Sequence, residues 1–141
     1  MSRPQDSTAP TSRPAAVNLI SAILVLEALG LLAVAGWYVY NLLTATATSL
    51  GGAIFSLILI LAVAAWLLVV GHFFFRGMRW TRAAALVWQL FMVAIAVPTL
   101  QGGVVLVGLL LLLPPAAILL LLFTKPVIAW TSRTNSEPKT Y

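Results

Sequence analysis

The chain has 141 residues, of which 62% are apolar and only 8% are charged, whereas soluble domains have about 25% charged residues. This composition excludes a water-exposed surface over most of the chain, and apolar segments long enough to cross a bilayer predict a multi-pass membrane protein. The absence of cysteine and the presence of a single histidine exclude a disulfide, a thiolate nucleophile and an ordinary zinc or iron–sulfur site, so we expect no metal and no cofactor.

The N-terminal segment, residues 1–14, contains three prolines, two arginines and several Ser and Thr residues. Its apolar surface is too small to offset the entropy of ordering, so we expect a disordered tail. Residues 15–40 are then apolar apart from Asn18, Ser21 and Glu27. This stretch is long enough to cross a hydrocarbon core of about 30 Å and is the first predicted transmembrane helix.

The same region has an alternative interpretation as a cleavable signal peptide. Two arginines, an apolar stretch and the small residues Ala33, Val34 and Ala35 follow one another in the order typical of such peptides. Cleavage would leave three transmembrane helices. We favour an uncleaved helix, because Glu27 interrupts the apolar core and the chain stays apolar and aromatic through Tyr40.

Three further transmembrane helices are predicted at residues 53–75, 82–100 and 104–124. They are separated by a Thr- and Ser-rich segment (41–52), a basic and aromatic segment (72–82) and the link PTLQGG (98–103). The last link is so short that the third and fourth helices must be antiparallel neighbours. The pair Lys125-Pro126 is expected to end the fourth helix, and residues 125–141 to form a polar tail. The predicted fold class is therefore all-α, a four-helix transmembrane bundle with short loops and disordered polar tails.

The basic residues predict the orientation of this bundle. With four helices, all eight Lys and Arg residues fall on one side: Arg3, Arg13, Arg76, Arg79, Arg82, Lys125, Arg133 and Lys139. The positive-inside rule then places both termini and the central basic loop on the cytoplasmic side. We expect the membrane to be a bacterial plasma membrane. Topology and anionic headgroups account for the net charge of +5, so nucleic-acid binding is not expected.

Glu27 is the main candidate for a functional residue. An acidic side chain near the centre of a transmembrane helix costs about 2.5–3.5 kcal/mol, so it needs a compensating contact. Counted from the cytoplasmic ends of their helices, Glu27, Gln89 and the pair Pro114 and Pro115 all lie about 10–15 Å deep. These four residues are predicted to form one intramembrane polar cluster.

The two prolines leave the carbonyls of Leu110 and Leu111 without their N–H donors, and a protonated Glu27 or the Gln89 amide is expected to donate to them. Gly30, one turn beyond Glu27, is expected to let another helix approach closely. We favour a role of this cluster in helix packing or in the pairing of subunits, either in a homo-oligomer or in a larger membrane complex. The alternative is a proton- or cation-binding carboxyl in a small secondary transporter.

The central basic loop offers a second candidate site. Arg76, Arg79 and Arg82 could contact anionic lipid headgroups, although their simpler interpretation is as topology signals, which we favour. No set of nucleophile, base and orienting residue can be assembled from His72, Asp6 and Glu137, so we do not expect an enzyme.

Two resemblances follow from short segments. The segment RWTRAAALVWQL from Arg79, the Gln101-Gly102-Gly103 turn and the Leu- and Pro-rich last helix resemble small four-helix integral membrane proteins of actinobacteria that have no assigned function. The segment LEALG around Glu27 is similar to the context of the essential carboxylate in small multidrug resistance transporters, which are similar in size and helix number. This second resemblance implies proton-coupled transport with Glu27 as the proton-binding residue. Glu27 is the only position to which the family's site is carried over, because the polar tails, the long uncharged first loop and the paired prolines depart from that family.

Overall fold

The computed structural model describes residues 12–45 and 49–132, and helices account for 88% of these residues. The helices are α1 (Ala15–Thr44), α2 (Leu50–Phe75), α3 (Trp80–Gln101), α4 (Val105–Leu122) and α5 (Lys125–Ser132). None of the described residues forms a strand. The first four helices are long and apolar enough to cross a membrane. The predicted all-α four-helix bundle is therefore confirmed.

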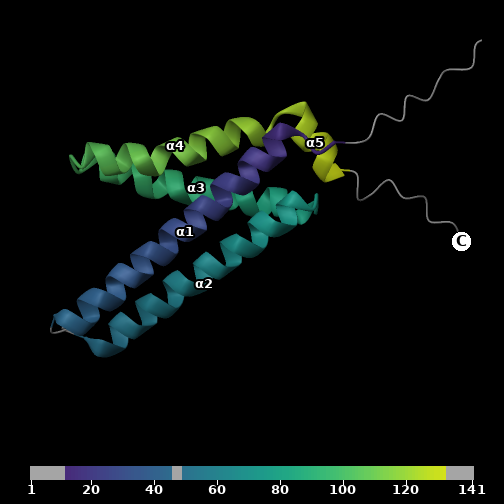
Figure 1. Ribbon diagram of the computed structural model, residues 1–141. Coiled ribbons are helices and arrows are strands. Elements are labelled where there is room, and N and C mark those ends of the chain that lie inside the picture. Colours follow the sequence, from purple (N-terminus) through teal and green to yellow (C-terminus); the bar gives the residue numbers. More distant parts are fainter. Residues whose placement is uncertain (1–11, 46–48, 133–141) are drawn as a thin grey trace, which may run out of the picture.

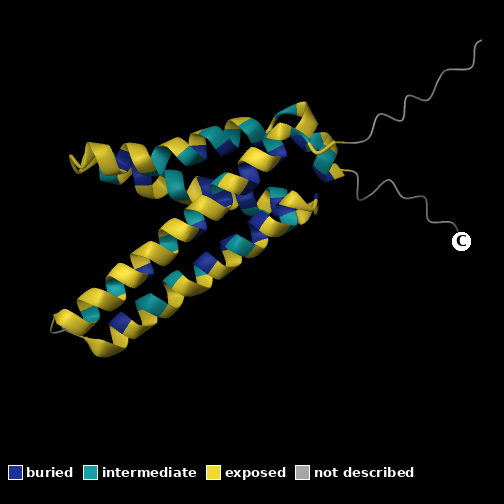
Figure 2. Ribbon diagram, in the orientation of Figure 1, coloured by how far each residue is buried: buried dark blue, intermediate teal, exposed yellow. Residues whose placement is uncertain are grey.

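The four long helices form two antiparallel hairpins, α1 with α2 and α3 with α4 (Figure 1). The helices within each hairpin contact each other extensively, whereas the two hairpins meet near one end and diverge toward the other. The buried core lies where they meet (Figure 2). Its residues come from the N-terminal halves of α1 and α3, from the C-terminal halves of α2 and α4, and from Val127 of α5.

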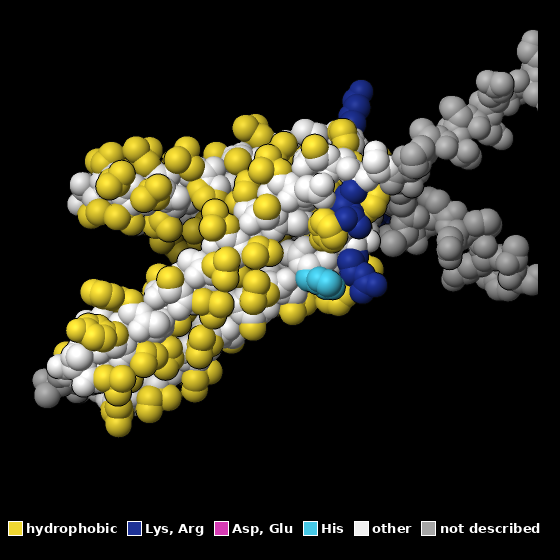
Figure 3. All heavy atoms as spheres, viewed as in Figure 1, with side chains coloured by type: hydrophobic (Ala, Val, Ile, Leu, Met, Phe, Trp, Pro, Cys, Tyr) yellow, Lys and Arg dark blue, Asp and Glu magenta, His cyan; other side chains and the backbone are white. Residues whose placement is uncertain are grey.

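Most of the outer surface is apolar, as a lipid environment requires. Leu43 and Leu120 are 82% and 75% exposed, and apolar side chains cover both hairpins along their length (Figure 3). The Lys and Arg side chains of the described residues instead gather at the end near α5. This arrangement identifies a membrane-embedded protein with one basic end, while its orientation stays a prediction.

Two glycines lie where helices pack closely, but neither is the one that the sequence predicted. A Cβ atom added to Gly108 of α4 would lie 2.5 Å from the Leu100 Cγ of α3. One added to Gly71 of α2 would lie 3.4 Å from the Leu24 Cβ of α1. A Cβ at Gly30 would meet nothing within 4 Å. The prediction of a close approach at Gly30 is therefore wrong, because this residue borders the space between the hairpins.

The uncharged end of the bundle has shorter connections than predicted. α1 continues past Tyr40 to Thr44, whose hydroxyl donates a hydrogen bond to the Tyr40 carbonyl. α2 begins at Leu50, and the preceding Ser49 hydroxyl accepts a hydrogen bond from the Gly52 N–H as an N-cap. α3 continues through Pro98, and the chain reverses at Gly103, where a φ of +83° favours glycine.

Both ends of the described chain differ from the predicted polar tails. The predicted tail 125–141 begins with helix α5, because Pro126 is tolerated in a first helical turn and Val127 and Thr131 become buried. At the other end, the Arg13 guanidinium lies 3.6 Å from the ring centroid of Phe75, so residues 12–14 are held against the bundle. The rest of both predicted tails, residues 1–11 and 133–141, lies outside the described residues.

Candidate functional site

Glu27 joins the two hairpins through hydrogen bonds. Its Oε2 atom accepts one from the Trp88 Nε1–H at 3.1 Å and one from the Gln89 Nε2–H at 3.0 Å. Both donors belong to α3, and both side chains are buried, Gln89 completely. By contrast, the Asn41 amide donates to the Trp37 carbonyl one turn earlier in the same helix. We call Glu27, Trp88 and Gln89 the polar junction.

Two oxygens of the polar junction have no partner. Glu27 Oε1 and Gln89 Oε1 are buried and accept no hydrogen bond. An unpaired polar atom in an apolar surrounding costs free energy, so this junction is only partly satisfied. A carboxylic acid has a donor as well as acceptors, so a proton on Glu27 would add a further hydrogen-bonding capacity here.

A cavity of about 310 Å³ lies beside the polar junction, between the diverging hairpins. Its wall is formed by apolar side chains of α1, α3 and α4, together with Glu27 and Trp88. Glu27 is the one titratable residue among those that line it. The carboxyl group is thus close to a space that a small apolar group or a lipid chain could occupy.

Only part of the predicted cluster of Glu27, Gln89, Pro114 and Pro115 is present in the structure. Gln89 contacts Glu27 as the common depth predicted, and Pro114 borders the cavity that Glu27 also borders. Pro115 is buried within α4. The expected donation to the Leu110 and Leu111 carbonyls is wrong, because the Gln89 amide donates to Glu27 and the carboxyl acts as an acceptor.

Trp88 was missed by the sequence analysis. Its indole N–H is a donor without an acceptor function, and a buried indole usually needs a partner. Its position next to Gln89 in the pair Trp-Gln was the available signal, because consecutive residues of a helix differ in depth by only about 1.5 Å.

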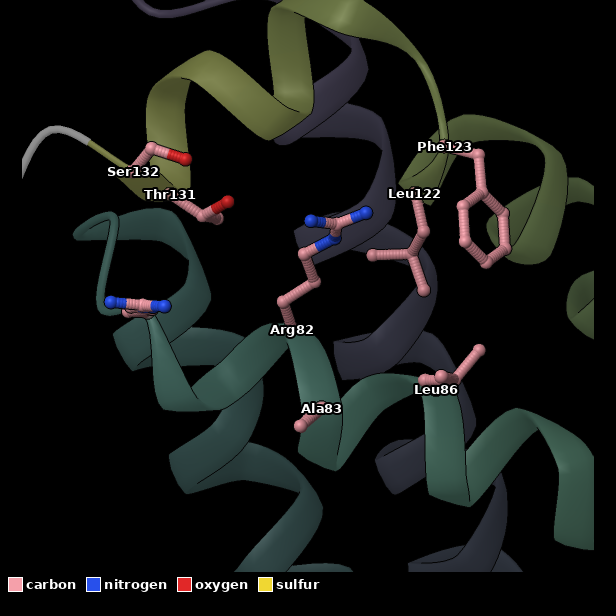
Figure 4. A pocket seen from close by; sticks show the side chains of 8 residues that line it. Arg82, Ala83, Leu86, Leu122, Phe123, Thr131 and Ser132 are labelled. Atoms are coloured by element: carbon pink, nitrogen blue, oxygen red, sulfur yellow. The ribbon is translucent and has the colours of Figure 1, made fainter.

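The basic end contains a second candidate site. Arg79 and Arg82 line a cavity of about 510 Å³ between the start of α3, the end of α4 and helix α5 (Figure 4). Arg76 is exposed and is not among the residues that line it. Two of the three predicted headgroup contacts are therefore brought together. Within residues 12–45 and 49–132, no group of three His, Cys, Asp or Glu side chains could hold a metal ion.

Comparisons with protein family models, with curated proteins and with solved structures found no match to this chain. Neither resemblance suggested by the short segments thus gains support from a relative.

Proposed function

We propose that this protein is a non-enzymatic multi-pass membrane protein, an accessory or assembly subunit whose two hairpins are paired specifically by the polar junction. The observation that supports this most directly is the pair of hydrogen bonds from Trp88 and Gln89 to Glu27. Through these bonds the Glu27 carboxyl group connects α1 with α3. Polar side chains that hydrogen-bond between transmembrane helices commonly serve packing and association.

The energies favour specificity over stability as the role of this junction. A hydrogen bond between transmembrane helices contributes about 0.6 kcal/mol on average and about 1.7 kcal/mol at most. At the average value, two such bonds contribute about 1.2 kcal/mol and offset only part of the roughly 2.5–3.5 kcal/mol that an acidic residue costs on insertion. An apolar residue at position 27 would insert more easily, but it would not select Trp88 and Gln89 as its neighbours. Buried polar groups that fix pairing and register are the best attested use of such a cost.

The diverging hairpins support a role in assembly. Beyond the polar junction, apolar residues that border the cavity remain substantially exposed, for example Val34 of α1 at 52% and Leu110 of α4 at 60%. In a bilayer, lipid chains or the helices of another subunit cover such surfaces. A second copy of this chain or a larger membrane complex is the partner that we propose.

A small proton-coupled secondary transporter is the alternative function. The observation in its favour is that Glu27 lines the cavity and that its Oε1 atom has no partner. The similarity of the LEALG segment to small multidrug resistance transporters points the same way. In this case a proton on the carboxyl would exchange with a substrate cation, because an intramembrane acid is a typical ion-binding group.

Substitution of Glu27 distinguishes the two functions. Glu27→Gln preserves the shape and hydrogen-bonding capacity, so under our proposal it keeps wild-type folding and assembly, whereas Glu27→Leu weakens both. Folding is measured by unfolding in mixed micelles and assembly by the particle mass in mild detergent.

The same variants are then compared in a proton-release assay. The lipophilic cation tetraphenylphosphonium is added to detergent-solubilised protein between pH 5 and 9. We expect no difference in proton release between the wild type and Glu27→Gln. Release that is present in the wild type and lost in Glu27→Gln would overturn the proposal in favour of transport.

A further inference from the structure

We propose that the cavity at the basic end binds the phosphate group of an anionic lipid. The cavity has a volume of about 510 Å³ and is formed where the first turn of α3, the end of α4 and helix α5 come together. Arg82 reaches from α3 into the space between the α5 hydroxyls of Thr131 and Ser132 and the side chain of Leu122 (Figure 4). The site therefore depends on α5, a helix that is absent from the predicted four-helix plan.

The cavity has an excess of positive charge that no acidic residue of the described chain neutralises. Arg79 and Arg82 both line it; Arg79 is the N-cap of α3 and Arg82 lies in its first turn. Glu27 is the one acidic residue within the described chain, and its hydrogen bonds run to Trp88 and Gln89. Two like charges in one cavity repel each other, so an anion between them would be strongly favoured.

The neighbouring groups favour the arginines as the donors to this anion. The Thr131 hydroxyl already donates to the carbonyls of Val127 and Ile128, and the Ser132 hydroxyl to that of Ile128. The Arg82 guanidinium carbon lies 5.8 Å from the ring centroid of Phe123, a contact that restricts its position. A guanidinium has a planar fork of N–H donors that matches a phosphate better than an ammonium does.

The remaining lining favours a lipid over free phosphate. Leu86, Leu122 and Phe123 add apolar surface next to the two arginines. Because α3 starts and α4 ends here, the cavity lies where a transmembrane protein meets the headgroup region. A lipid can place its phosphate on the guanidinium groups and its glycerol and upper acyl chain on the apolar residues. Inorganic phosphate would use only the first of these contacts.

Arg76 provides a matched control. It has the same charge and is exposed like Arg79, but it does not line the cavity. General attraction between a basic loop and anionic headgroups would depend equally on all three arginines. A specific site depends on Arg79 and Arg82 and not on Arg76.

The test measures lipid binding by native mass spectrometry of the full chain purified in detergent. Dioleoyl phosphatidylglycerol is the probe, and dioleoyl phosphatidylcholine is the lipid without net charge. We expect Arg79→Gln and Arg82→Gln each to lower the affinity for phosphatidylglycerol about tenfold, since each removes a charge-assisted hydrogen bond. Arg76→Gln is expected to leave it unchanged. Thermal unfolding of the lipid-free variants shows that the substituted proteins still fold.

Three outcomes would overturn the proposal. Equal losses for all three Gln variants would reduce the effect to general headgroup attraction. Equal binding of the two lipids would show that no anion is recognised. Millimolar inorganic phosphate that displaces phosphatidylglycerol would show that a free anion, and not a lipid, is the ligand.

Discussion

The hydrogen bond between Glu27 and Gln89 predicts an energetic coupling between the two hairpins. We consider Glu27→Leu, Gln89→Leu and the double variant, in which leucine replaces each polar side chain. The donor–acceptor distance is 3.0 Å and Gln89 is fully buried. We therefore expect a coupling free energy of about 1 kcal/mol, within the range known for interhelical bonds in membranes.

The single variants should lose more than this coupling. Glu27→Leu leaves the donors of Trp88 and Gln89 without an acceptor, so we expect a loss of about 1–2 kcal/mol in the free energy of unfolding. Gln89→Leu leaves Trp88 as a donor to Glu27 and should be milder. The double variant should lose less than the sum of the two, by the coupling free energy.

The free energies are measured by titrating the purified protein in mixed micelles with sodium dodecyl sulfate and following tryptophan fluorescence, since all five tryptophans remain in these variants. Asn18 provides the control, because this polar residue of α1 is exposed and has no hydrogen bond with α3. Asn18→Leu and Gln89→Leu should therefore be additive. A coupling between positions 27 and 89 below about 0.3 kcal/mol would refute the polar junction as the link between the hairpins.

Two further predictions concern helix packing and topology. Gly108→Ala should destabilise the α3–α4 hairpin by about 1–3 kcal/mol, because the added Cβ overlaps Leu100. Gly30→Ala should be neutral or stabilising by up to about 1 kcal/mol. Equal effects of the two substitutions in the micelle titration would contradict this packing. A single cysteine that replaces Gln101 should react with an impermeant thiol reagent in intact cells, whereas one that replaces Arg76 should not, because the basic loop is predicted to be cytoplasmic. The reverse pattern would show the opposite orientation.

The number of transmembrane helices was predictable from the sequence because backbone groups in lipid must be hydrogen-bonded within each segment. Long apolar segments are therefore helical whatever their neighbours are. The contact of Glu27 with Gln89 was predictable for a related reason. Both depths could be counted from the basic ends of their helices at a fixed rise per residue.

The direction of the side chains was not predictable in the same way. α1 and α4 are apolar on all faces, so hydrophobic periodicity does not indicate which face meets another helix. For this reason Gly30 was placed in a helix contact that Gly71 and Gly108 make instead. Helix α5 was missed because Lys-Pro favours a helix end locally, while the burial of Val127 depends on residues far away in the sequence.

The unequal lengths of the helices give a physical reason for the divergence of the hairpins. α1 has 30 residues and is about 45 Å long, whereas α4 has 18 residues and is about 27 Å long. A hydrocarbon core of about 30 Å accommodates α4 nearly upright, but α1 must tilt or extend into the headgroup region. With the basic residues of both hairpins at one surface, the hairpins therefore diverge toward the other (Figure 1). Glu27 lies close to the point of divergence, where its bonds to α3 fix the pairing before the two hairpins separate.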